Sequence, residues 1–529
     1  MQRRLFLPAL LFCAVGLAGL HGPAHAAEFT DLLDAADDLD DFDDETYKAF
    51  DFSIEPRFRF NTGGATITRE APCVPPDDLS LQDSLVANNP RLIQEPGRCS
   101  EATIVFNKEM LYEETQSTID VTLRAGLYKD LEIRLTVPYV LSATRGLQYA
   151  NDNSQKSVDA TNSSVDPSSA RIQNDAQAVF SPSDTQQQAL NKLDQFNTYR
   201  YFELTDEMNR IERTGFADPS IGIHWAPFND ERDDTKATLL FGMDYVMPIV
   251  PIARPDNRAV GRGVHELQWK LAASKRFNWI EPYFGLQYFL PFVATDSLLR
   301  PVDDRDNVGQ VIKSPPQRGL ITVGTEFVPH IDARTGARYA IDLRFQYGYT
   351  SEGRDYTPLF DHMSSSDCNG LTIEEVLPQF DTAGNLNNAD AVACSWVIRE
   401  AANAFPTPIY DLATAAAAGS ASPFSTDGIM TVESYGTFSG QLAFNLQPSR
   451  YFQLRLAGGI THKQQHFLTN SRTGRNSDRT ADDTVALTGP EARFERNPVY
   501  NPTYDSPGNR FRVEQYNVWH VAVTTALQF

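Results

Sequence analysis

Long hydrophobic runs are scarce in this chain of 529 residues. A membrane-spanning helix needs about 20 consecutive apolar residues, and the only stretch of this kind runs from Leu5 to Leu20. The remaining chain is rich in charged residues, which make up 22% of the whole. A bundle of membrane helices is therefore excluded.

Basic residues are also in short supply. The sequence has 46 Lys and Arg against 69 Asp and Glu, which gives a formal net charge of -23 at pH 7. Nucleic-acid binding requires a basic surface that neutralises phosphates. We therefore expect no nucleic-acid partner.

The N-terminus has the pattern of an export signal. Arg3 and Arg4 precede the apolar run, and Ala24-His25-Ala26 provides a small-x-small cleavage site. This pattern predicts a signal peptide over residues 1–26 and an exported mature chain that begins at Ala27.

Residues 27–47 form an acidic segment before the remainder of the chain. Ten acidic residues lie between positions 28 and 45, and apolar residues recur among them every three or four positions. This spacing predicts an amphipathic acidic helix in the periplasm. A solvated lead-in, a plug docked in a barrel mouth and a cation-binding segment are alternative interpretations.

Cysteine is rare, with five residues, of which Cys13 lies in the signal peptide. An even number in an exported chain favours disulfides. Cys73 and Cys99 fall in one long connection, whereas Cys368 and Cys394 fall in another. Pairing within each connection is the simplest of the three connectivities that four cysteines allow.

The dominant pattern from residue 48 onward is strict alternation of apolar and polar residues. Between Tyr339 and Tyr349, for example, one face is aromatic and aliphatic, and the other carries Asp342, Arg344 and Gln346. Alternation of this kind is typical of two-faced strands. Twelve segments show it: 48–61, 102–127, 131–144, 215–227, 236–248, 263–276, 279–292, 317–330, 337–350, 431–446, 450–467 and 510–529.

The lengths of the segments and connections favour a membrane barrel over a soluble sandwich. A tilted membrane strand needs about 9 to 11 residues, whereas the mean soluble strand has about 5 to 6. Long and short connections alternate, and the longest cover 62–101, 145–214, 351–430 and 468–509. We therefore predict an all-β, closed antiparallel transmembrane barrel over 48–529, with about 12 strands, long extracellular loops and short periplasmic turns. Fourteen strands is the rival count, because 102–127 is too long for one membrane pass.

The C-terminal segment predicts how such a barrel is inserted. Apolar residues share one face of an alternating strand that stops on an aromatic residue, a pattern that resembles the signal read by the outer-membrane barrel insertion machinery. The residues are Trp519, Val521, Val523, Leu527 and Phe529. The expected location is the cell outer membrane, with its lipid and the insertion machinery as partners.

Three short motifs resemble one known family. Residues 124–132 (RAGLYKDLE), followed by Pro138-Tyr139, resemble the R-x-G-L-T-D-R-L-E and P-Y hairpin of the outer-membrane transporter family named for the meta-pathway of phenol degradation. Residues 215–222 (GFADPSIG) resemble its G-x-G-D-x-x-x-G motif, with Ala217 in place of a glycine, and Met247-Pro248 stands where that family has P-T-G. The resemblance implies a channel of roughly twelve strands, similar in plan to long-chain fatty-acid channels.

If the apolar faces meet lipid, the opposite faces line the lumen. This reasoning predicts a charged set of lumen-lining residues: Glu55, Arg57, Arg59, Asp120, Arg124, Glu132, Arg134, His224, Asp244, Glu266, Lys270, Glu281, Asp342, Arg344, Arg455 and His520. Opposed charges can form a selective polar path. The same side chains can instead fill a narrow barrel as ion pairs.

These observations predict an outer-membrane channel or transporter for passive diffusion of small solutes, amphipathic or aromatic. Loop-based binding of a partner or surface polysaccharide, with the barrel as anchor, and polysaccharide export are the alternatives. No serine nucleophile motif accompanies His224 or His520, and no metal-type cluster of His or Cys is present in the sequence. We therefore expect no enzymatic activity, metal or cofactor, while the oligomeric state stays open.

Overall fold

The structure is a computed structural model, and its description covers fifteen stretches of the chain. They are residues 52–73, 103–128, 131–150, 180–184, 208–229, 235–254, 257–295, 297–299, 314–332, 335, 337–363, 378–388, 429–449, 451–469 and 510–528. Within these stretches, no helix has the length and apolar character needed to cross a membrane.

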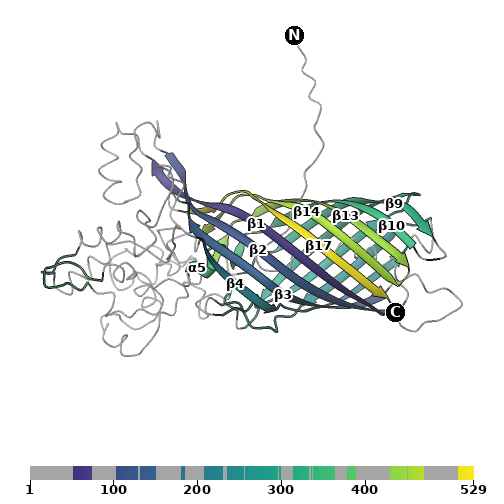
Figure 1. Ribbon diagram of the computed structural model, residues 1–529, viewed down its shortest axis with the longest axis horizontal. Coiled ribbons are helices and arrows are strands. Elements are labelled where there is room, and N and C mark those ends of the chain that lie inside the picture. The colour runs from purple at the N-terminus through teal and green to yellow at the C-terminus, as the bar shows by residue number, and fades with distance from the viewer. Residues whose placement is uncertain are drawn as a thin grey trace, which may run out of the picture.

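The described strands form one closed antiparallel barrel with twelve wall positions (Figure 1). The wall strands are β1 (Phe52–Cys73), β2 (Thr103–Tyr128), β3 (Leu131–Tyr149), β4 (Asn209–Phe216) continued by β5 (Ser220–Phe228), β6 (Thr238–Val246), β7 (Val264–Ser274), β8 (Ile280–Val293), β9 (Arg318–Asp332), β10 (Ala337–Thr350), β13 (Tyr435–Ser449), β14 (Phe452–Lys463) and β17 (Tyr516–Gln528). β4 and β5 share one position because both pair with β3. The ring closes where β1 pairs with both β2 and β17, so that Arg57 lies opposite Asp120 on one side and Thr524 on the other.

Shorter strands pair with one another at one end of the barrel. β11 (Gly353–Tyr356), β12 (Ile429–Val432), β15 (His466–Thr469) and β16 (Phe511–Val513) pair in that order, and β16 pairs with β1. The single described helical turn, α5 (Phe360–Met363), follows β11. The long connections leave from this end, which we call the long-loop end.

The twelve predicted segments all correspond to strands, and the rival count of fourteen is wrong. The segment 102–127 is one strand of 26 residues, paired with β1 as far as Cys73, and the ends of β1 and β2 project past the neighbouring strands in Figure 1. Because β1 extends to Cys73 and β3 to Tyr149, the connections that follow these two strands start later than the predicted 62 and 145.

One wall strand starts earlier than its alternation suggests. The chain joins β3 at Asn209 rather than at 215, and the pairing is interrupted between Phe216 and Ser220. Gly215 has a φ of 140°, which favours glycine, and Pro219 has no N–H for a ladder hydrogen bond. The interruption divides the strand into β4 and β5.

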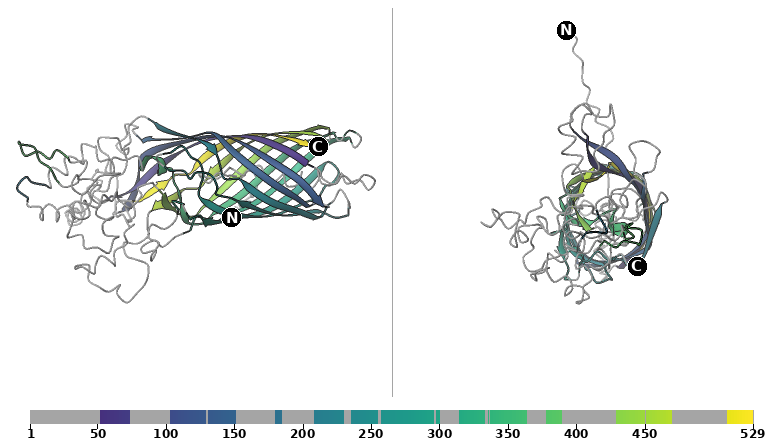
Figure 2. Two further views of the ribbon diagram at one scale, coloured as in Figure 1. Left: turned by 90° about the horizontal axis from the view of Figure 1, so that it is seen from below. Right: turned by 90° about the vertical axis from the view of Figure 1, so that its left-hand side faces the viewer.

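The two faces of the wall have opposite chemistry. Large apolar side chains such as Trp269, Ile321, Tyr347 and Trp519 are exposed on the outside, whereas charged side chains are buried inside. This distribution of apolar and charged side chains is the reverse of that in a soluble protein and indicates a barrel that spans a membrane. Closure of the barrel gives the backbone N–H and C=O groups of every strand edge a hydrogen-bond partner. Figure 2 shows the ring in end view.

The two ends of the barrel differ as an outer-membrane barrel requires. Ser53 near the start of β1 is paired with Gln528 at the end of β17, so both lie at the short-turn end. By the usual orientation, this end is periplasmic and the long-loop end is extracellular.

Several predictions fall on residues outside the description. They are the signal peptide 1–26, the acidic segment 27–47, Cys99, Cys368, Cys394 and Phe529. Cys73 ends β1, but its side chain is not described. Both disulfides and the complete insertion signal stay predictions, although Trp519, Val521 and Leu527 do lie exposed on the outer face of β17.

Candidate functional site

The lumen of the barrel holds the charged side chains. The structure places all sixteen lumen-lining candidates among the buried residues, namely Glu55, Arg57, Arg59, Asp120, Arg124, Glu132, Arg134, His224, Asp244, Glu266, Lys270, Glu281, Asp342, Arg344, Arg455 and His520. Phe58, between two of them in β1, is 38% exposed. Such burial means that the inward side chains pack against one another, and their ion pairs join residues of one strand or of strands close together in the wall.

The first cluster joins β1 and β2. Glu55 is paired with Arg57 at 3.1 Å and also with Arg124. Arg59 approaches Asp120 on the facing strand at 2.6 Å. Each carboxylate is held by at least one guanidinium, which offsets the cost of removing these charges from water.

The second cluster crosses β3, β5, β6 and β7. Glu132 is paired with Arg134. The His224 ring lies between two carboxylates, with Nδ1 3.4 Å from Glu132 and Nε2 3.1 Å from Asp244. Lys270 approaches Asp244 at 2.8 Å. Between the first and second clusters lies a cavity of about 30 Å³, which we call the lower cavity.

A third cluster occupies the opposite wall. Asp342 accepts a hydrogen bond from the Tyr283 hydroxyl at 2.6 Å and is paired with Arg455 at 2.7 Å and Arg344 at 3.4 Å. Glu281 on β8 lies 3.1 Å from Arg276 in the adjoining turn.

His520 lies within the electrostatic range of Arg344 in the third cluster but forms no ion pair with a carboxylate in the part of the chain that the structure describes. It is buried on β17, and among the described residues neither of its ring nitrogens has a hydrogen-bond partner.

Toward the long-loop end, two connections fold into the lumen. We call the described residues of 251–263 and 353–363 the loop plug. Arg213 on β4 donates hydrogen bonds to the carbonyl oxygens of Arg254, Asn257 and Ala259 at 2.9–3.0 Å, and to the Asp361 carboxylate. One wall guanidinium therefore holds both parts of the plug.

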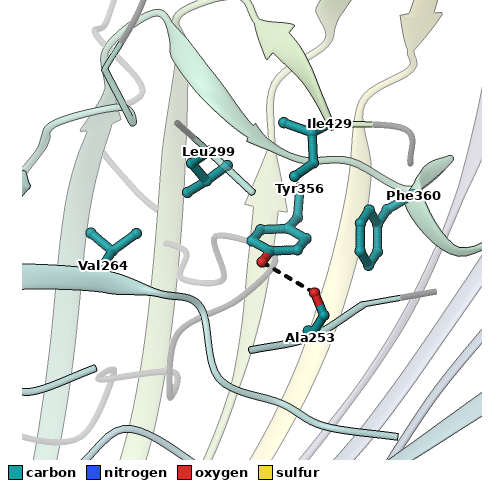
Figure 3. Close-up of a cluster of buried hydrophobic side chains, with 6 residues drawn as sticks. All are labelled: Ala253, Val264, Leu299, Tyr356, Phe360 and Ile429. Carbon is teal, nitrogen blue, oxygen red and sulfur yellow. Dashed lines mark hydrogen bonds between the residues drawn. The ribbon is translucent and has the colours of Figure 1, made fainter. Parts of the chain in front are cut away.

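An apolar cluster packs the plug against the wall (Figure 3). Its buried members are Ala253, Val264, Leu299, Tyr356, Phe360 and Ile429. The Tyr356 and Phe360 rings meet edge to face with centroids 4.6 Å apart, and the Tyr356 hydroxyl donates to the Ala253 carbonyl at 3.4 Å. Burying these rings stabilises the plug inside the barrel.

Beneath the plug lies a second cavity of about 80 Å³, which we call the upper cavity. Arg145, Arg213, Arg262, Arg318, Asp218 and Glu266 line it together with small apolar side chains from the wall and the plug. Glu266 holds Arg318 at 2.8 Å and Arg262 at 3.6 Å. Pro138, Asp218 and Val246 line both cavities, so the two lie one above the other along the lumen.

Sequence reasoning missed several residues of the plug and upper cavity. Arg318 lines the upper cavity from the inner face of the segment 317–330, the face that also carries the buried Thr322, so alternation could have identified this arginine. Asp218 belongs to the motif at residues 215–222, but it does not fall on the polar face of an alternating strand. Arg213 and Asp361 lie in stretches interpreted as loops, where no periodicity marks the inward face.

Among the residues that the structure describes, no group of three or more His, Cys, Asp or Glu side chains is placed so that it could hold a metal ion.

No family model matches the chain, and no curated protein matches it either. The resemblance to the transporter family named for phenol degradation therefore stays a prediction.

Several solved structures are similar at low identity. An outer membrane channel from Pseudomonas putida F1 is 8% identical, with 90% of this chain and 96% of that chain covered and a TM-score of 0.32. The outer membrane protease OmpT from Escherichia coli is 8% identical over 92% and 100% of the two chains, with a TM-score of 0.27. A FadL homologue from Pseudomonas aeruginosa is 7% identical over 91% and 90%, with a TM-score of 0.24.

Proposed function

We propose that the protein is a gated outer-membrane channel through which small, amphipathic or aromatic solutes diffuse passively. The observation that carries this proposal is the stack of two charged cavities in the lumen beneath a plug formed by loops. A wall that only anchored external loops would not need a polar interior closed by a separate set of contacts.

The lining of the upper cavity supports an amphipathic solute. Arg213, Arg262 and Arg318 provide hydrogen-bond donors on one part of the surface, whereas Val140, Val246, Val260 and Val264 are apolar. A solute with one polar end and one apolar end can satisfy both parts at once. Opposed fixed charges further along the lumen would then select among the solutes that enter.

The cavity volumes support gating. An engineered cavity of about 150 Å³ binds benzene, and the upper and lower cavities have about 80 and 30 Å³. An aromatic ring can therefore pass only after the loop plug moves and the ion pairs of the lower cavity rearrange. Passage would be intermittent rather than continuous.

Planar-bilayer recording on the folded mature protein tests this function. We expect discrete openings separated by long closures. In parallel, proteoliposome swelling should be faster with benzyl alcohol or benzoate than with a sugar of similar size. Protein that is shown to be folded but gives neither current nor swelling would contradict the proposal and favour binding by the external loops.

A further inference from the structure

The upper cavity holds buried polar atoms that lack hydrogen-bond partners. Among the described residues, the Nε atoms of Arg213, Arg262 and Arg318 have no acceptor, and Asp218 Oδ1 has no donor. All four residues line this one cavity. Buried polar groups are nearly always satisfied, so a set of four at one place calls for an occupant.

Terminal nitrogens of each of the three guanidinium groups already donate hydrogen bonds to the protein, and these bonds hold the three side chains in place. Arg213 is held by the plug carbonyls and Asp361. Arg262 donates to Asp355 at 2.8 Å. Arg318 donates to both oxygens of Glu266 at 2.8 and 2.9 Å. The Nε–H groups are therefore left over on rigidly held side chains.

Asp218 is fixed in a comparable way. Its Oδ2 accepts a hydrogen bond from the Arg262 backbone N–H at 3.0 Å, and the Val250 backbone N–H also lies near the carboxylate, while Oδ1 has no hydrogen-bond partner among the described residues. An occupant that suits the cavity must therefore accept from guanidinium groups and donate to a carboxylate. It must also place carbon atoms against the valine side chains.

We infer that the upper cavity binds a short-chain hydroxycarboxylate. A carboxylate is the strongest acceptor for guanidinium N–H groups, and its two oxygens can accept several hydrogen bonds. The hydroxyl donates to Asp218 Oδ1, which also separates the two negative charges. With the plug closed, a volume of about 80 Å³ suits a molecule of a few carbon atoms, whereas the larger aromatic solutes pass only after the plug has moved. The inference rests on the proposed function, because the site lies in the proposed path and would act there as its selective point.

Equilibrium dialysis of radiolabelled lactate against the folded, detergent-solubilised full chain tests the site. Propionate lacks the hydroxyl and lactamide lacks the carboxylate. We expect saturable binding of lactate, about tenfold weaker binding of propionate, and no measurable binding of lactamide. Equal affinities for the three, or no saturable binding because water alone fills the cavity, would overturn the inference.

Variants separate the contacts. Arg318→Gln should weaken lactate binding about tenfold or more, whereas Asp218→Asn should remove the preference for lactate over propionate. Val260→Trp fills the cavity while keeping every charge, and it should abolish binding in protein that still shows the heat-resistant mobility of a folded barrel. Arg276→Gln, which alters an ion pair with Glu281 outside the cavity, is the matched control and should bind as the wild type does. Lactate binding retained in Val260→Trp would overturn the site.

Conductance measured on the same preparations distinguishes the two proposals. Openings without lactate binding would leave the channel standing and remove the site. Lactate binding without openings would support the site and contradict the channel.

Discussion

Arg213 on the barrel wall donates to the carboxylate of Asp361, which lies 148 residues further along the chain and in the loop plug. Both side chains are buried, and Arg145 approaches the same carboxylate at 3.7 Å. This contact joins the wall to the loop plug. In the gated channel that we propose, it contributes to the closed state, and its loss should weaken that state.

Asp361→Asn should make the channel open more often. Removing one partner of a buried ion pair costs about 3–5 kcal/mol, and here the loss falls on the closed position of the plug. We expect the open probability in bilayer recordings to rise by more than about tenfold. Asp381→Asn, in an exposed turn held by Asn385, is the control. An unchanged open probability in Asp361→Asn would show that the plug does not gate.

Acid should favour the open plug. Burial lowers the pKa of the His362 imidazole, which donates to the Asn209 carbonyl at 3.1 Å and lies next to Asp361. The closed state thus binds fewer protons than an open state with a solvated imidazole near its usual pKa of about 6.5. The contribution of His362 to the closed state is therefore fully present above about pH 6.5 and is lost as the pH falls below that value. We expect openings to increase between about pH 7 and pH 5, and His362→Gln to remove that part of the increase.

Lys270→Met should shift ion selectivity. Lys270 is the lumenal cation nearest Asp244, at 2.8 Å, and its loss leaves the lower cavity more negative. The change is on the order of 1 kcal/mol for a passing ion, so the cation-to-anion permeability ratio should rise several-fold. Reversal potentials in a salt gradient measure this ratio. Lys236→Met, at an exposed turn position, should give the wild-type value.

Two glycines of β9 provide a matched test of packing. A Cβ at Gly324 would lie 2.3 Å from Cζ and from the hydroxyl oxygen of Tyr283, and that hydroxyl donates to Asp342. A Cβ at Gly319 would meet nothing within 4 Å. Gly324→Ala should therefore lower the free energy of unfolding by about 1–3 kcal/mol, and Gly319→Ala should leave it nearly unchanged. Denaturant titration of the folded barrel measures both. Equal effects would contradict the described packing around Tyr283.

The depth of the outer face in the membrane can be tested on β17. Val521 lies midway along the strand and Leu527 lies near its short-turn end, and both are exposed. Arginine on the lipid face costs about 2–4 kcal/mol at the bilayer midplane and about 0–1 near an interface. Val521→Arg should therefore destabilise the lipid-embedded barrel more than Leu527→Arg. The reverse order in reversible unfolding from vesicles would place the membrane elsewhere on the barrel.

The architecture of the barrel follows from local sequence pattern. Apolar and polar residues alternate along each strand, and every second side chain of a strand points the same way. The alternation therefore predicts which side chains face lipid and which face the lumen. For that reason the twelve strands and the inward position of residues such as Asp342 and Arg344 could be read from local pattern alone. The interruption between β4 and β5 was not predicted, because the residues there do not pair with β3 and so do not have to alternate.

The contents of the barrel interior depend instead on contacts between residues far apart in the sequence. The partners of Arg213 come from the stretches 254–259 and 361, and no local pattern relates such distant positions to one another. Loops carry no periodicity that marks an inward face, and ion-pair partners across a barrel are set by closure and register. The plug, the upper cavity and its unsatisfied donors therefore follow from how the ring closes, whereas the ring itself follows from the order of residues along each strand.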